Sequence, residues 1–509
     1  MPRSTAGRTG RLRARSRALL VAFVAVLAGC AGGGGDGARS PGVDGGPTAS
    51  SPAASPSRLD WDRCGAVECA TVAVPLDHDE PDGPALDLAL ARRPASGERL
   101  GALLVNPGGP GAPALDLAKR ATEFFPESLT DRFDVVAWDP RGVGESAGID
   151  CTDDLDALWA ADRSPDDERE AAAVVEVATD LGRACAGAAG DRLAHVSTAD
   201  TVRDLELIRE ALGEEQISYL GFSYGTFLGA RYAEAHPDRV RAMVLDGAVD
   251  PSLGPEETAR AQAAGFETSF ATFLADCAAD TGCAFHSGGD PGAAYDRLAA
   301  RIDAEPIDGV VDGETRRLGP GELDLGVTTA LYSGRRAWRP LAEALAAAER
   351  GDGAALLRFA DTYTGREPGG GYADDLEAFF AVSCLDGPPI GDPDAVLRAG
   401  EAIGRESPRF GEATALLGME CATWPVPATG RTGPVVAAGA PPILVLGTTR
   451  DPATPLRWAE SLAGQLEAGV LAVLDGETHT AFGQGSECID QIVVRALVEE
   501  VLPPDGTRC

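Results

Sequence analysis

The sequence predicts an α/β protein built on a mostly parallel sheet of eight strands, with a large helical cap inserted after the sixth strand. Three observations support this prediction. Short apolar runs alternate with stretches of helical periodicity in two parts of the chain, which is typical of a parallel sheet covered by helices. A long Ala- and Leu-rich interval without strand-like runs separates the two parts. In addition, 44% of the 509 residues are hydrophobic, which is enough for a packed core and excludes disorder of the whole chain.

The first part begins with an antiparallel pair of strands, 69–75 and 85–91. Two apolar runs follow, at 101–105 and 133–138, and each ends in a loop rich in glycine and proline. The next segment, 198–212, is predicted to be a helix because its apolar residues recur every three or four positions. The remaining predicted elements are strands at 217–220 and 240–245, a helix at 226–236, strands at 442–446 and 469–474, and a last helix near 489–501.

Residues 252–438 form the predicted helical cap. Pro255 followed by two glutamates is typical of a first helical turn, and long helical stretches come after it. The flanking parts, 59–251 and 439–509, together hold 264 residues, an ordinary size for one α/β domain. We therefore expect one α/β core in two parts and one insertion.

Residues 1–29 have the features of an export signal. Six arginines and no acid precede an apolar run at 18–28, which is too short to cross a bilayer as a helix. A Leu-Ala-Gly sequence directly before Cys30 resembles the lipobox of bacterial lipoproteins, which implies cleavage before Cys30 and its lipidation. The alternative is an ordinary secretory signal with an incidental cysteine. Residues 30–58, rich in Gly, Ser, Pro and Ala, are expected to be a flexible tether, so the expected location is the outer face of the cell membrane as a lipoprotein, or secretion.

The chain is strongly acidic. It carries 44 basic and 79 acidic side chains, a formal net charge of −35, and removal of residues 1–29 with their six arginines lowers this charge to −41. Because the phosphates of a nucleic acid would be repelled, nucleic-acid binding is not expected. Contact with a membrane is expected through the lipid anchor only.

Ten cysteines remain besides Cys30, an even number that suggests disulfides in an exported chain. The sequence does not determine their pairing, and sequential pairing is the simplest hypothesis. A zinc site is the alternative, but no C-x-x-C motif occurs and the five histidines show no ligand spacing, so no metal and no cofactor are expected. The ten candidates are Cys64, Cys69, Cys151, Cys185, Cys277, Cys283, Cys384, Cys421, Cys488 and Cys509.

A G-x-S-x-G motif at Gly221–Gly225 places Ser223 between an apolar strand and a helix. At such a junction a sharp turn lifts the serine above the sheet edge, and the two glycines leave room for the turn. In a chain with 63 glycines the pentapeptide alone is weak evidence, and a plain glycine-rich turn is the alternative. Its position between strand and helix indicates a catalytic nucleophile.

A serine hydroxyl needs a base to act as a nucleophile, and the base needs an acid that orients it. His479 follows the predicted strand 469–474, whereas the other four histidines fit the setting at a strand end less well. Asp451 follows the predicted strand 442–446 in a loop stiffened by two prolines. The chain order Ser223, Asp451, His479 is the order found in hydrolases with a G-x-S-x-G turn, which indicates a catalytic triad.

An oxyanion hole needs two backbone N–H groups. One is expected from Tyr224, directly after the nucleophile. The other is expected from Gly109 in the loop after the strand 101–105, where the absence of a side chain lets the backbone approach a substrate. Asn106, the one asparagine of the sequence, is expected to hold this loop by side-chain hydrogen bonds.

Four segments carry a resemblance to a known family. The chain resembles the actinobacterial tripeptidyl aminopeptidases of the α/β-hydrolase fold, which are relatives of proline iminopeptidase, and the mycobacterial cell-envelope serine hydrolases described as proteases and esterases. The resemblance implies the triad named above under a helical cap. It covers about 60–251 and 440–509 well and the insertion loosely, and Ala112-Pro113 departs from the small residues that relatives often have there. The four segments are Asn106–Gly111, Trp138–Ser146, Gly221–Gly225 and Val244–Gly247.

The expected function is that of an exported, lipid-anchored serine hydrolase, first of all an aminopeptidase that releases short peptides through an acyl-enzyme on Ser223. Its substrate would be a peptide with a free N-terminus, whose ammonium is held by carboxylates of the cap. Glu256, Glu257 and Asp386 are candidates for this contact. The alternative is a carboxylesterase or lipase that uses the same triad below an apolar acyl groove.

Two further alternatives are disfavoured. An anchored binding protein without activity would require a broken triad, and all three residues are present. A dinucleotide-binding turn would use Gly142-x-Gly144-x-x-Ala147 after the strand 133–138. No clear helix start follows that turn, and no acidic strand end lies downstream, so the pattern lacks its required context.

Overall fold

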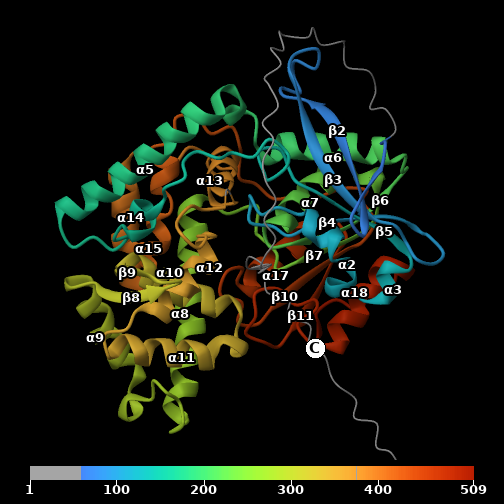
Figure 1. The fold of residues 1–509 in the computed structure, drawn as a ribbon. Coiled ribbons are helices and arrows are strands. Elements are labelled where there is room, and N and C mark those ends of the chain that lie inside the picture. Colours follow the sequence, from blue (N-terminus) through green and yellow to red (C-terminus); the bar gives the residue numbers. More distant parts are fainter. Residues whose placement is uncertain (1–58, 374) are drawn as a thin grey trace, which may run out of the picture.

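The computed structural model describes residues 59–373 and 375–509 (Figure 1). The predicted export signal, Cys30 and the tether therefore lie outside the described residues. The strands of one large sheet are, in order across it, β1 (Asp62–Cys64), β2 (Val67–Pro75), β3 (Ala85–Arg93), β5 (Phe133–Trp138), β4 (Gly101–Asn106), β6 (Ile217–Phe222), β7 (Val240–Asp246), β10 (Ile443–Thr448), β11 (Gly469–Leu474) and β12 (Thr507–Arg508). In this order, neighbouring strands are antiparallel from β1 to β5 and parallel from β5 to β12, which confirms the predicted α/β class with a mostly parallel sheet.

Eight of these ten strands are the ones predicted from apolar runs, and two short edge strands are additional. β1 has three residues and β12 has two, so neither is long enough to show an apolar pattern. Disulfides hold both ends of the sheet: Cys64 is bonded to Cys69, and Cys509 to Cys488. The two disulfides thus favour the pairing of β1 and β12 with the sheet, which the short sequences of these strands do not predict.

Helices cover both faces of the sheet, which explains why the central strands are buried along their whole length. Because side chains alternate along a strand, Leu104 of β4 packs under one helical layer, and Leu103 and Val105 pack under the other. The first layer consists of α6 (Thr198–Leu212), α7 (Tyr224–Ala235) and α17 (Leu456–Gln465); the second consists of α1 (Leu115–Lys119), α2 (Ala121–Phe124), α3 (Glu127–Thr130) and α18 (Glu487–Glu499).

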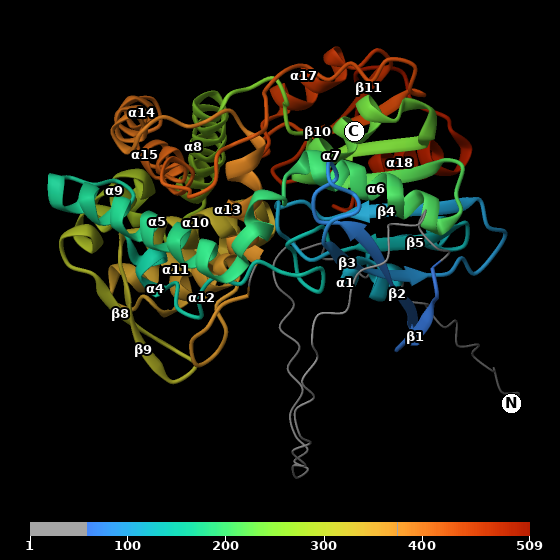
Figure 2. The ribbon, with the colours of Figure 1, turned by 90° about the horizontal axis from the view of Figure 1, so that it is seen from above.

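The chain between β7 and β10 forms a second lobe beside the sheet (Figure 2). This lobe, the cap, has its own core of aromatic and aliphatic side chains centred on Phe270, Phe273 and Trp338. A two-stranded hairpin, which the sequence does not predict, interrupts its helices. The cap elements are α8 (Pro255–Ala279), α9 (Pro291–Ala304), β8 (Ile307–Val311), β9 (Glu314–Leu318), α10 (Pro320–Tyr332), α11 (Arg335–Glu349), α12 (Ala354–Thr364), α13 (Asp375–Asp386), α14 (Pro393–Glu406), α15 (Gly411–Leu416) and α16 (Met419–Ala422).

Two helices that precede β6 in sequence pack against the cap, although the sequence analysis placed residues 59–251 in the core. They are α4 (Asp156–Ala160) and α5 (Glu168–Ala189). Val174 of α5 shares a hydrophobic cluster with Val396 of α14, and α5 lies beside α14 and α15 in Figure 1. Trp159 of α4 stacks on Phe380 of α13, with ring centroids 6.3 Å apart. The apolar face of a helix does not show which lobe will cover it. For α4 and α5, the covering lobe is the cap.

Two disulfides lie within the cap and its added helices. Cys151–Cys185 ties the segment before α4 to α5, and Cys384–Cys421 ties α13 to α16. Closing loops of 34 and 37 residues is expected to stabilise the folded chain by roughly 3–4 kcal/mol each. The remaining bridge, Cys277–Cys283, closes the end of α8, so all ten cysteines pair in sequential order.

Among the helices of the described residues, none has the length and apolar character needed to span a membrane.

Candidate active site

Ser223 lies in the turn between β6 and α7, above the carboxyl edge of the sheet. Its backbone has φ 52° and ψ −123°, a strained conformation for a residue with a side chain. The turn is so tight that a Cβ atom on Gly221 would lie 2.4 Å from the carbonyl oxygen of Gly225. A Cβ atom on Gly225 would lie 2.8 Å from Oδ1 of Asn106. Both glycines of the motif are therefore required by close packing around the raised serine.

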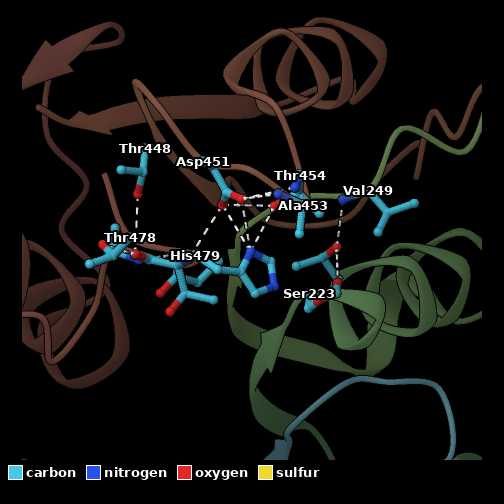
Figure 3. A network of polar contacts seen from close by, with 12 residues as sticks. Ser223, Val249, Thr448, Asp451, Ala453, Thr454, Thr478 and His479 are labelled. Atoms are coloured by element: carbon cyan, nitrogen blue, oxygen red, sulfur yellow. Dashed lines mark hydrogen bonds and ion pairs between the residues drawn. The ribbon is translucent and has the colours of Figure 1, made fainter. Parts of the chain in front are cut away.

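Asp451 and His479 meet above the same edge of the sheet (Figure 3). Nδ1 of His479 lies 3.0 Å from each carboxylate oxygen of Asp451. The other side of the imidazole ring faces Ser223 in Figure 3, and no hydrogen bond joins this ring to the Ser223 hydroxyl among the described residues. Such contacts are often long in an enzyme without substrate and shorten in the reacting complex. The three predicted triad residues are thus gathered in one place from the segments after β6, β10 and β11.

The Asp451 carboxylate is held by its own loop. It accepts hydrogen bonds of 2.9 Å from the backbone N–H groups of Ala453 and Thr454 and from the Thr454 hydroxyl. The Thr454 oxygen also lies 3.3 Å from Nδ1 of His479. Sequence reasoning missed Thr454, although a hydroxyl residue three positions after the acid in a proline-stiffened loop is a usable signal. These contacts fix the carboxylate so that it can orient the imidazole.

A second buried carboxylate, Asp246 at the end of β7, holds the backbone segment that follows His479. Its two oxygens accept hydrogen bonds of 2.8 Å from the N–H groups of Ala481 and Phe482. Burial raises the pKa of Asp246 to about 6, against the opposing effect of these two hydrogen bonds. Burial lowers the pKa of His479, but the carboxylates of Asp451 and Asp246 together raise it by more, so the pKa of His479 lies above the ordinary value of a histidine.

The loop that holds one expected oxyanion donor, Gly109, runs beside the nucleophile turn that holds the other, Tyr224. The loop after β4 runs so close to this turn that a Cβ atom on Gly108 would lie 3.1 Å from the Tyr224 nitrogen. As predicted for Asn106, its Oδ1 holds the loop by accepting a hydrogen bond from the Gly108 N–H at 3.0 Å. Within the described residues, no acceptor is recorded for the N–H groups of Gly109 and Tyr224. N–H groups without an internal acceptor are what an oxyanion hole requires of its donors.

Comparison with known proteins agrees with this geometry. A family model described as alpha/beta hydrolase fold matches residues 101–287, and one described as TAP-like protein matches residues 407–509. Serine protease Hip1 of Mycobacterium tuberculosis (strain ATCC 25618 / H37Rv) is 39% identical over 460 residues, covering 87% of this chain and 88% of that protein. The chain belongs to this family of α/β-hydrolase serine peptidases. The resemblance stated from the sequence motifs is therefore confirmed.

Other members of the family carry different names. Tripeptidyl aminopeptidase of Streptomyces lividans is 33% identical over 456 residues, covering 86% of this chain and 83% of that protein. Carboxylesterase B of Mycobacterium tuberculosis (strain ATCC 25618 / H37Rv) is 39% identical over 453 residues, covering 87% and 86%. Among solved structures, proline iminopeptidase from Mycobacterium smegmatis matches with a TM-score of 0.37 and 16% identity, covering 84% of this chain and 98% of that chain.

In this α/β-hydrolase chain a cavity of about 2400 Å³ lies between core and cap. Its wall includes Ser223, Tyr224 and His479 from the core, and residues of α8, α10 and α13 from the cap. Tyr332, the last residue of α10, packs edge-on against the His479 ring with centroids 5.3 Å apart. The Tyr332 carbonyl also accepts a hydrogen bond of 3.2 Å from the His479 N–H. The cap therefore contacts the catalytic base directly.

The three cap carboxylates considered in the sequence analysis lie in different settings. Glu256 lines the cavity but is exposed and forms an ion pair of 2.8 Å with Arg260. Glu257 accepts a hydrogen bond of 2.9 Å from the Gly254 N–H and so caps the start of α8. Asp386 lines the cavity and accepts hydrogen bonds from the N–H and the hydroxyl of Thr198, at 2.7 and 2.5 Å. Each of the three already has a partner in the folded chain.

The Asp-Pro-Arg-Gly segment after β5 has a structural role. Buried Asp139 accepts hydrogen bonds from the N–H groups of Ala114, Leu115 and Glu145. These bonds join the end of the loop after β4 to the segment after β5. A Cβ atom on Gly144 would lie 2.5 Å from the Asp139 carboxylate, so this glycine is required for the contact. The segment from 141 to 147 forms turns and does not begin a helix, which excludes the dinucleotide-binding alternative.

In the described part of the chain, no group of three or more His, Cys, Asp or Glu residues is placed to hold a metal ion.

Proposed function

We propose that this serine peptidase is an aminopeptidase that releases short peptides from a free N-terminus through an acyl-enzyme on Ser223. The observation that carries the proposal is the pairing of Asp451 with a His479 ring that faces Ser223, in the wall of a cavity between core and cap. A cavity between two lobes can receive the end of a peptide chain. One relative, from Streptomyces lividans, carries the name tripeptidyl aminopeptidase.

In the proposed mechanism, His479 accepts the Ser223 proton while the serine oxygen attacks the scissile carbonyl carbon. Asp451 holds the imidazole through Nδ1 and stabilises its charged form. The N–H groups of Tyr224 and Gly109 bind the negative oxygen of the tetrahedral intermediate. His479 then gives its proton to the leaving amine, and a water molecule activated by the same histidine releases the acyl group from Ser223.

The activity is expected to fall at acid pH because His479 must be neutral to accept a proton. Its pKa is raised above the ordinary value of a histidine by Asp451 and Asp246, so kcat/KM is expected to decline at a higher pH than for an ordinary histidine as the pH falls. Asp246→Asn removes one of the two carboxylates that raise this pKa and is expected to move the decline to lower pH. Profiles of kcat/KM against pH for wild type, for this variant and for the exposed control Asp475→Asn measure the shift. An identical decline in all three proteins would contradict the electrostatic contribution of Asp246.

Hydrolysis by the same triad of esters without an ammonium group is the second candidate function. It is favoured by a relative named Carboxylesterase B at 39% identity. A peptide anilide with a free amino group, its N-acetylated form and a short-chain ester distinguish the two functions. The aminopeptidase proposal predicts that acetylation lowers kcat/KM by about 10-fold or more, since the charged hydrogen bond to the ammonium is lost. Equal rates for the free and acetylated peptides, with faster hydrolysis of the ester, would establish the esterase instead.

We also propose that the chain is exported and anchored to the outer face of the cell membrane through lipidated Cys30. The arginine-rich start, the short apolar run and the Leu-Ala-Gly sequence before Cys30 support this proposal. Membrane fractionation of wild type and Cys30→Ala tests it. Release of the variant from the membrane fraction is expected, and an equal distribution of both proteins would contradict the anchor.

A further inference from the structure

A buried glutamate, Glu477, lies two residues before the catalytic histidine and contacts both lobes of the molecule. Its Oε1 accepts hydrogen bonds of 3.1 and 2.9 Å from Nε and Nη2 of Arg450 in the core. Its Oε2 lies 3.2 Å from Nε of Arg335 in the cap. Each carboxylate oxygen thus binds an arginine of a different lobe, and one side chain joins the two lobes next to His479.

On the core side, Glu477 links the loop of the catalytic base to the loop of the catalytic acid. Arg450 directly precedes Asp451, and the Arg450 N–H donates a hydrogen bond of 3.1 Å to the Gly476 carbonyl. The Asp451 carboxylate contacts Nδ1 of His479 at 3.0 Å (Figure 3). The ion pair of Arg450 with Glu477 and the triad contact of Asp451 with His479 therefore connect the same two loops.

On the cap side, Glu477 contacts the turn between α10 and α11. A Cβ atom on Gly334 would lie 2.7 Å from the Glu477 carbonyl oxygen, so the two backbones pack directly against each other. Arg335 is itself held by the cap, because its guanidinium pairs with Asp276 of α8 at 3.0 Å and lies 4.3 Å from the centroid of a Trp338 ring. Movement of the cap would therefore be transmitted to Glu477.

The segment around the catalytic histidine depends on such contacts. Thr480 has φ 68°, a left-handed conformation that persists in a residue with a side chain only where the surroundings hold it. The His479 N–H donates a hydrogen bond of 3.2 Å to the Tyr332 carbonyl, which adds a second contact from the same cap turn. A displacement of about 1 Å in a catalytic group can lower the rate about 100-fold, so these contacts bear on catalysis.

We infer that Glu477 is a positioning residue: through Arg335 and Arg450 it fixes the His479 segment to the cap, so that seating of the cap on the core aligns the catalytic base with Ser223. The inference rests on the proposed acyl-enzyme mechanism at Ser223 and applies to peptide and ester substrates alike. Glu477 takes no part in the chemical step.

The test measures kcat and KM of wild type, Glu477→Gln and Arg335→Gln on a peptide anilide and on a short-chain ester, with active sites counted by complete fluorophosphonate titration. Each substitution is expected to lower kcat per active site by about 10-fold on both substrates, because both reactions use His479, and to leave KM within about 2-fold. The double variant is expected to lose no more than Glu477→Gln alone, since both changes break one contact. Arg335→Lys keeps the charge and is expected to retain most of the wild-type kcat.

Two variants provide matched controls. Asp475→Asn removes another acid that pairs with Arg450, at 3.3 Å, but this acid is exposed. Arg339→Gln removes an exposed cation of α11 that pairs with Glu343 of the same helix at 2.9 Å. Both controls are expected to keep the wild-type kcat.

Wild-type kcat per active site in Glu477→Gln or Arg335→Gln would overturn the inference. This holds even for a variant that melts at a lower temperature, because a merely structural role lowers stability without slowing the folded enzyme. Losses that multiply in the double variant would overturn the shared contact. Failure of the proposed function shows in a different protein, as activity that survives in Ser223→Ala.

Discussion

Replacement of Ser223 by alanine is expected to lower kcat/KM for peptide hydrolysis by roughly 10⁴- to 10⁶-fold, the loss seen when a serine nucleophile is removed. The strained turn that raises Ser223 brings it to the wall of the cavity, near the His479 ring. Without the hydroxyl no acyl-enzyme forms, and the remaining groups retain only their binding and oxyanion contributions. Steady-state kinetics on a tripeptide anilide measure the loss.

Ser383 provides a matched control because it lines the same cavity and has no part in the proposed chemistry. Ser383→Ala is expected to keep the wild-type kcat/KM. The account would be contradicted if Ser223→Ala kept more than about one-hundredth of the wild-type rate, since removal of a nucleophile leaves far less.

Replacement of Asp451 by asparagine is expected to lower kcat by about 10⁴-fold with little change in KM. The neutral amide cannot stabilise the charged imidazole, and its NH₂ group favours the wrong tautomer of His479. The loop is expected to keep its shape, because the amide oxygen can still accept from the N–H groups of Ala453 and Thr454. A circular dichroism melt of the variant checks that the fold is retained.

Asp475 offers a comparison of the same chemical change. Asp475 lies four residues before His479 in the sequence and is exposed. It accepts a hydrogen bond of 2.9 Å from the Thr449 hydroxyl and forms an ion pair of 3.3 Å with Arg450. Asp475→Asn is expected to leave kcat unchanged. Equal losses in the two variants would show that Asp451 acts only through the general charge of the region.

The sheet and the triad could be predicted because both depend on short-range patterns. Buried parallel strands are continuous apolar runs, and the catalytic groups follow them at the carboxyl edge. Ser223, Asp451 and His479 could therefore be located from the G-x-S-x-G motif, the strand ends and the chain order. The edge strands β1 and β12 were not predicted because two or three residues show no periodicity. The strand β9 was not predicted because its Glu-Thr-Arg-Arg-Leu sequence is polar and pairs only within an exposed hairpin.

The carboxylates that support the site could not be chosen from the sequence. Among 79 acidic residues, nothing in the local pattern separates Asp246 from solvated neighbours. What distinguishes Asp246 is its burial by segments far away in the chain: at the end of β7, it accepts hydrogen bonds from N–H groups that follow His479. Likewise, the packing of α5 on the cap depends on contacts with residues more than 200 positions later, which helical periodicity does not reveal.

The measurement that tests the central claim most directly is the site of covalent modification by a fluorophosphonate. Intact-mass analysis and peptide mapping of wild type are predicted to show one adduct, on the peptide that contains Ser223, and none in Ser223→Ala. Asp451→Asn is predicted to be labelled at the same serine, but more slowly. An adduct that persists in Ser223→Ala, or that maps to another residue in wild type, would contradict the assignment of Ser223 as the nucleophile.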